Sequence, residues 1–173
     1  LALALGGFAI GTTEFAAMSL LPFYAADFAI TEPVAAHAVS AYALGVVVGA
    51  PILGLFGANW PRRHLLVVLM VLIALGNAAT VMAPGYYALL AFRFLSGLPH
   101  GAYFGVAALL AASLIPERRA AAASYVMAGL AVATVIGALP LVIRGGAGAA
   151  ARQSIGVVVV FGVSLATIIT LFL

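Results

Sequence analysis

The chain contains no cysteine, no lysine and very few charged residues of any kind. The absence of cysteine excludes disulfide bridges and thiolate metal sites. Only 6% of the 173 residues are charged, whereas a soluble domain is usually about one quarter charged. So few charges cannot cover a surface that faces water, and we therefore expect lipid to surround this chain.

The apolar residues are abundant and continuous, at 66% of the chain with a mean hydropathy of +1.30. In lipid the backbone must satisfy its own hydrogen bonds, which leaves helices or closed barrels. The runs are long and do not alternate between polar and apolar residues, which favours helices over barrel strands. The fold class predicted is all-α, a single polytopic transmembrane bundle over residues 1–173. Its six candidate spans are residues 1–26, 34–58, 64–83, 86–115, 120–143 and 152–173.

The basic residues are seven arginines, and they give the chain a net charge of +3. They occur singly or in pairs between apolar runs, not on one basic face, so no nucleic-acid partner is expected. Pairs follow the second and fourth spans: Arg62, Arg63, Arg118 and Arg119. Arginine-rich connections stay in the cytoplasm, so this pattern predicts a cytoplasmic amino terminus. Arg144 and Arg152 follow the fifth span and would then face outward, which is against the same rule.

Three ionisable residues stand out deep inside the candidate spans: Glu14, Arg93 and His100. Each costs roughly 2.5–3.5 kcal/mol to insert, so such residues usually serve a function. His100 follows Arg93 by seven residues, which places both on one helical face. We interpret them as a pathway for substrate and protons, in which Glu14 changes its charge and Arg93 adjusts that change. The alternatives are a buried pair that fixes helix register, and a histidine that only bonds a carbonyl freed by Pro99.

Two tyrosines, Tyr42 and Tyr103, are candidates for lining the same pathway, although aromatic residues on spans also face lipid or pack in the core. Glycines recur every four residues at Gly45 and Gly49, and again at Gly97, Gly101 and Gly105. This spacing favours close helix packing, and the same faces are able to rock during transport.

The connection that contains Trp60, Arg62 and Arg63 is either a cytoplasmic gating loop or only a topology signal. No metal-ligand spacing, phosphate-binding glycine loop or Ser/His/Asp arrangement is present. We therefore expect no metal, no cofactor and no enzymatic activity.

Three stretches carry a family resemblance: residues 11–22 with Glu14, residues 93–101, and in part residues 129–140. With them the chain resembles the amino-terminal half of a major facilitator superfamily transporter, in the drug:proton antiporter branch with its arabinose- and sugar-efflux-like proteins. The resemblance links Arg93 to proton coupling. It links the fifth-helix motif, with Gly137 and Pro140, to antiport direction and closure of the outer gate. It also implies a bacterial inner membrane location.

The chain departs from this family in two respects. The family's loop between the second and third helices carries an aspartate and a glycine, whereas this sequence has Ala58 and Pro61 there. Family members normally have twelve spans, and this chain has half that number. A second copy or a missing second half is therefore an expected partner, beside the bilayer, a small-molecule substrate and protons.

A second resemblance concerns residues 130–173, which look like the last two helices of a resistance-nodulation-division efflux pump. Two functions follow from the whole sequence. The first is half of a proton-coupled drug or sugar-like efflux transporter that works by alternating access. The alternative is a non-transporting membrane bundle, truncated, chimeric or designed, with a structural or interaction role.

Overall fold

The computed structural model describes residues 1–143, 162 and 164, with side chains described through residue 139 and at the latter two positions. This part is helical and contains no strand. The elements are α1 (Ala2–Ser19), α2 (Leu21–Asp27), α3 (Glu32–Ala35), α4 (His37–Phe56), α5 (Arg62–Val81), α6 (Tyr86–Leu114), the 3-10 turn η1 (Pro116–Arg118) and α7 (Arg119–Ile143).

Five helical stretches in the described part are long and apolar enough to cross a membrane. They are Ala2–Ser19, Glu32–Phe56, Arg62–Val81, Tyr86–Leu114 and Pro116–Leu139. Large apolar side chains lie exposed along them, including Leu55, Val81 and Leu109. Outward-facing apolar side chains of this kind suit acyl chains as the surrounding solvent. The sixth candidate span, residues 152–173, lies outside the described residues.

The first candidate span, residues 1–26, forms two helices rather than one. The helix ends at Ser19, and a new helix starts at Leu21 with Pro22 as its second residue. Proline has no N–H to give to a preceding turn, so the break falls just before it. The second candidate span is likewise split at Ala36, between α3 and α4.

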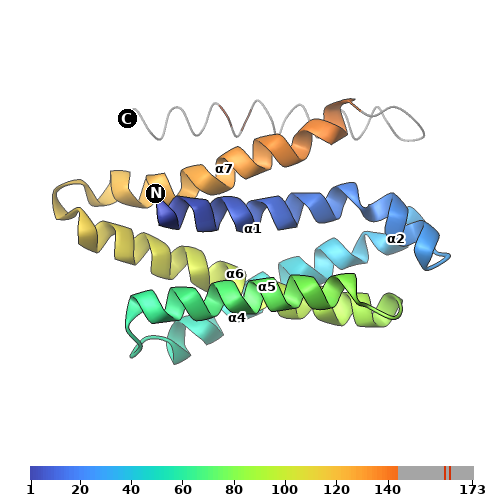
Figure 1. Cartoon of the computed structure of the whole chain (residues 1–173), viewed down its shortest axis with the longest axis horizontal. Coiled ribbons are helices and arrows are strands. Elements are labelled where there is room, and N and C mark those ends of the chain that lie inside the picture. The colour runs from blue at the N-terminus through green and yellow to red at the C-terminus, as the bar shows by residue number, and fades with distance from the viewer. Residues whose placement is uncertain (144–161, 163, 165–173) are drawn as a thin grey trace.

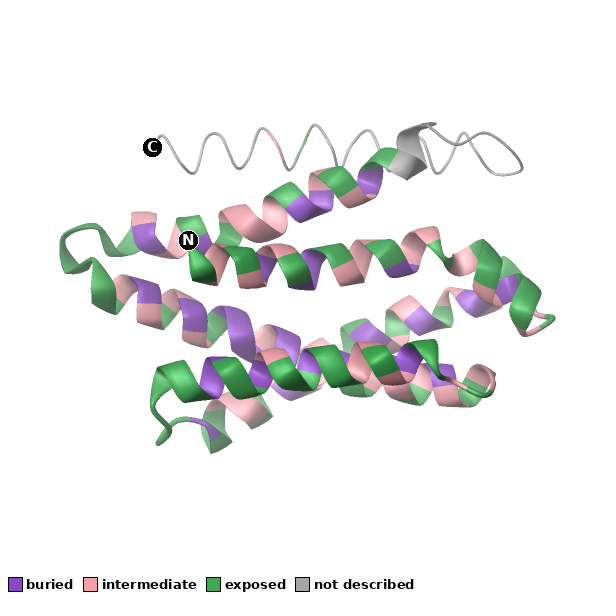
Figure 2. Cartoon of the chain, viewed as in Figure 1, coloured by how far each residue is buried: buried purple, intermediate pink, exposed green. Residues whose placement is uncertain are grey.

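Helix α6 is the centre of the bundle. About 50% of the residues in an apolar 18-residue stretch of this helix are buried, against 17–28% in such stretches of the other four candidate spans. It packs against α4, α5 and α7, while α1 pairs mainly with α7. Figure 1 shows the pair of α1 and α7 on one side and the group of α4, α5 and α6 on the other. The buried residues concentrate along α6 (Figure 2).

Glycine allows α4 and α6 to approach closely. A Cβ at Gly45 would overlap the Phe94 carbonyl, and one at Gly97 would overlap the Tyr42 carbonyl. Contacts this close between backbones are possible only where side chains are absent. Gly101 also lies at this contact, since a Cβ there would overlap the Ala50 side chain, whereas Gly105 has no heavy atom within 4 Å of its Cβ position.

The amino terminus and the arginine pairs lie at one end of the bundle. The α4–α5 connection and the α6–α7 connection are both on the side of Leu1, and the α5–α6 connection is on the opposite side (Figure 1). Arg62 and Arg63 occupy the first turn of α5 instead of a loop. Likewise, Arg118 ends η1 and Arg119 begins α7.

Candidate functional site

Arg93 is the most deeply buried charged residue in the described part of the chain, at 2% exposure. Its Nε donates a hydrogen bond to the Ala38 carbonyl at 3.4 Å, and its guanidinium carbon lies 4.3 Å from the centroid of the Tyr42 ring. The ring face attracts the cation. However, Nη2 has no hydrogen-bond partner among the described residues. A buried N–H without an acceptor is costly, so this atom is available to a group that enters the site.

Tyr42 connects Arg93 to His100. A hydrogen bond of 2.8 Å joins the Tyr42 hydroxyl oxygen and His100 Nδ1, and the two rings meet edge to face with centroids 5.7 Å apart. The close approach at Gly97 lies between Arg93 and His100 on α6 and presses against the backbone of Tyr42. This contact at Gly97 holds the Tyr42 side chain between Arg93 and His100. Nδ1 of His100 bonds the tyrosine hydroxyl, not a carbonyl freed by Pro99.

Glu14 approaches the same place from the other side. It is half-buried on α1, and its carboxylate interacts electrostatically with the Arg93 guanidinium and the Tyr42 phenol. No direct ion pair joins Glu14 to Arg93 within residues 1–139. Glu14 on α1 and Arg93 on α6 are therefore opposite charges on separate helices that are not joined by a direct ion pair.

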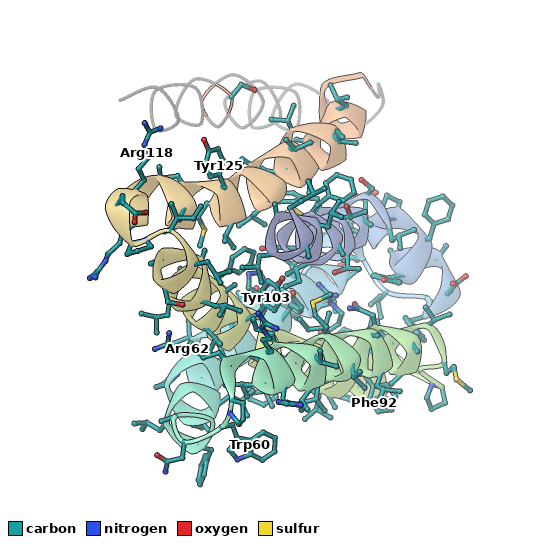
Figure 3. All side chains as sticks on the ribbon, turned by 60° about the vertical axis from the view of Figure 1, so that its left-hand side comes forward. Trp60, Arg62, Phe92, Tyr103, Arg118 and Tyr125 are labelled. Atoms are coloured by element: carbon teal, nitrogen blue, oxygen red, sulfur yellow. The ribbon has the colours of Figure 1, made fainter. Side chains whose placement is uncertain are left out.

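Tyr103 follows His100 by three residues on α6. Its hydroxyl donates a hydrogen bond to the Leu3 carbonyl at 3.0 Å and so ties α6 to α1. The ring centroids of Tyr103 and Phe104 are 5.6 Å apart, and those of Phe104 and His100 are 5.2 Å apart. Figure 3 shows Tyr103 in the interior, whereas Trp60 and Arg118 lie at the periphery.

Four of the predicted site residues lie apart from this cluster. Arg62 and Arg63 are exposed at the end of the bundle where α5 begins, whereas α6 begins at the other end and reaches Arg93 two turns later. Gly137 packs α7 against α1, because a Cβ there would overlap Phe15. Pro140 lies in the last part of α7, and its side chain is outside the described residues. No group of three metal-binding side chains occurs in the described part.

Two partners of Arg93 were missed from the sequence. Tyr24 on α2 interacts electrostatically with the guanidinium, and the Ala38 carbonyl accepts its hydrogen bond. Pro22 signals the helix break that carries Tyr24 to this position, but its direction depends on tertiary packing. A backbone carbonyl has no signature in the sequence.

Comparison with known proteins gives one family. The model of the Major Facilitator Superfamily matches residues 3–173. The chain is 44% identical over 138 residues to "Inner membrane transport protein YdhP" of Escherichia coli strain K12, covering 79% of this chain and 36% of that protein. It is 42% identical over 142 residues to "Putative transporter AraJ" of the same strain, covering 82% and 36%. It is also 33% identical over 130 residues to "Chloramphenicol resistance protein" of Streptomyces lividans, covering 75% and 33%.

These matches cover most of this chain but only a part of each relative. The chain spans about a third of the length of the curated relatives that it matches. The family match runs through residue 173 and so includes the segment with the second resemblance. The resemblance of that segment to a resistance-nodulation-division pump finds no support in these comparisons.

Proposed function

We infer the function from one premise, that the chain belongs to the Major Facilitator Superfamily. This is a family of membrane transporters and not of enzymes. We propose that the chain forms one half of a proton-coupled efflux transporter that works by alternating access. The proposed location is the bacterial inner membrane, with the amino terminus in the cytoplasm. The Escherichia coli relative is named an inner membrane transport protein, which supports this location, and the arginine pairs support the orientation.

The observation that carries the proposal is the buried, incompletely bonded Arg93. A guanidinium at this depth is costly to insert into the bilayer, and one of its N–H groups has no acceptor in the described part of the chain. Glu14 lies close enough to interact with it electrostatically from a different helix group. A proton on Glu14 removes the negative charge that faces the guanidinium. Protonation therefore changes the attraction between α1 and α6, which is the coupling that a proton-driven transporter needs.

The remaining residues of the pathway extend from this pair. Tyr42 on α4 lies against the interior face of α6, where His100 and Tyr103 follow; together they present hydroxyl, imidazole and ring surfaces. A few polar groups among aromatic rings are typical of sites for small amphipathic molecules. One relative is named a chloramphenicol resistance protein, and chloramphenicol is a molecule of this kind. We therefore propose an amphipathic drug or a sugar-like molecule as the substrate class.

The chain needs a partner to enclose a substrate. Transporters built from repeats bind their substrates near the middle of the bilayer, at the interface between their two halves. We propose that a second copy of this chain, or a second half, covers the face of α1 and α4 beside Glu14. The oligomeric state in mild detergent tests this step, because a monomer without transport favours the non-transporting bundle.

Transport into proteoliposomes tests the proposal as a whole. The chain is reconstituted, an acidic interior is imposed, and uptake of chloramphenicol is measured. We expect uptake by the unmodified chain, and reduced but measurable uptake for Glu14→Gln and Arg93→Ala. Glu117→Gln is the matched control, because this carboxylate is exposed in η1 and far from α1 along the chain. No uptake by the unmodified chain contradicts a transporter built from two copies of this chain. Equal uptake by all variants contradicts the proposed roles of Glu14 and Arg93.

A further inference from the structure

A second cationic site lies at the other end of α6. A cavity of about 370 Å³ opens there, lined by Arg62, Leu109, Ala112, Ser113, Pro116 and Arg119. Arg62 begins α5 and Arg119 begins α7, so two separate helices bring one guanidinium each to the same space. Figure 3 shows Arg62 beside the end of α6 and Arg118 on the outer side of the turn.

The two guanidinium groups of the cavity have no carboxylate of their own. The whole chain has four carboxylate residues, and all of them lie in the described part: Glu14, Asp27, Glu32 and Glu117. Within that part, no ion pair joins one of them to Arg62 or Arg119. Glu117 is close to Arg119 in sequence but does not line the cavity. Neither arginine of the cavity is therefore tied up in an ion pair with a carboxylate of the described residues.

The arginines are not needed to complete the end of α6. The Ala111 carbonyl accepts the Ile115 N–H at 3.3 Å, and the Leu110 carbonyl accepts the Ser113 hydroxyl at 2.7 Å. The Ile115 carbonyl accepts the Arg118 N–H at 3.1 Å. In addition, α5 and α7 begin at the cavity, and the amino-terminal end of a helix favours negative charge.

The position of the cavity relative to the bilayer indicates which anion it binds. It lies at one end of the apolar helices, where headgroups of the bilayer are found, and Leu109 and Ala112 give it an apolar inner wall. Basic pockets between membrane helices bind phosphate-bearing headgroups. We propose that Arg62 and Arg119 form a binding site for the phosphate of an anionic phospholipid, with its acyl chain against the end of α6. This proposal does not depend on the transport function.

Lipid binding by the purified full chain tests the site directly. Native mass spectrometry in mild detergent counts bound phosphatidylglycerol and phosphatidylcholine added at equal concentrations. We expect phosphatidylglycerol to bind preferentially. An arginine near the bilayer surface contributes about fivefold to such binding, so R62A/R119A should lose about 25-fold in affinity. The matched control is R63A/R118A, which removes the same charge next to the cavity but not from its lining.

The result that supports the site is a loss for the cavity pair that is clearly larger than the loss for the control pair. An equal loss in both pairs means general surface charge and overturns the proposal. Equal binding of phosphatidylcholine overturns it as well. If inorganic phosphate binds as tightly as phosphatidylglycerol, a free anion is the ligand and the lipid assignment is wrong. R62K/R119K keeps the charge if the alanine pair fails to fold, and it must then bind phosphatidylglycerol more tightly than phosphatidylcholine.

Discussion

Replacing Gly97 by alanine should separate α4 from α6 and disturb the candidate site. The added Cβ would overlap the carbonyl oxygen of Tyr42, and it would lie 3.2 Å from the Val46 nitrogen. These are backbone atoms, which cannot move aside as a flexible side chain can. An overpacked contact of this kind costs about 1–3 kcal/mol of stability. If the helices separate by about 1 Å, the 2.8 Å bond from Tyr42 to His100 becomes longer than a hydrogen bond.

Gly105 on the same helix supplies the matched control. No heavy atom lies within 4 Å of its Cβ position, so Gly105→Ala adds a methyl group without a clash. Unfolding in a mixed-detergent titration, followed by the fluorescence of the single tryptophan Trp60, gives both free energies. We expect Gly97→Ala to lose about 1–3 kcal/mol and Gly105→Ala to change by less than about 0.5 kcal/mol. Equal stability of the two variants would refute the close packing of α4 on α6.

Three further predictions concern hydrogen bonds and orientation. Tyr42→Phe leaves Nδ1 of His100 without its partner, so the free energy of unfolding should fall by about 1–3 kcal/mol, and an unchanged value contradicts the contact. Tyr103→Phe removes the bond from α6 to α1 and should cost about 0.5–1.5 kcal/mol in the same titration; a neutral effect contradicts it. The chain has no native cysteine, so Arg63→Cys should react with impermeant reagents only from the cytoplasm and Gly85→Cys only from outside. The reverse labelling would invert the proposed orientation.

The sequence predicted those parts of the fold that depend on local composition. Long apolar runs indicated the helices, and the spacing of Arg93 and His100 placed both on one buried face. The glycine spacing of α4 and α6 predicted their close packing. By contrast, the direction of α2 was not predictable, because Pro22 signals the break after Ser19 but the course of the next helix depends on tertiary packing.

The candidate site was predictable only in its side chains of unusual chemistry. Glu14 and Arg93 stand out because charge is rare in this chain. Tyr42 was one aromatic residue among many, and only the packing of α4 on α6 shows that it joins Arg93 to His100. Tyr24 and the Ala38 carbonyl had no sequence signal at all, since their proximity to Arg93 is a property of the tertiary structure.

A double-mutant cycle on transport tests the coupling of Glu14 to Arg93 most directly. Uptake driven by a pH gradient is measured for Glu14→Gln, Arg93→Gln and the double variant in the same liposomes. Residues that act as a unit give non-additive losses, so we predict that the double variant transports no less than the weaker single variant. Losses that simply multiply in the double variant would show that the carboxylate and the guanidinium act independently, and would contradict the account.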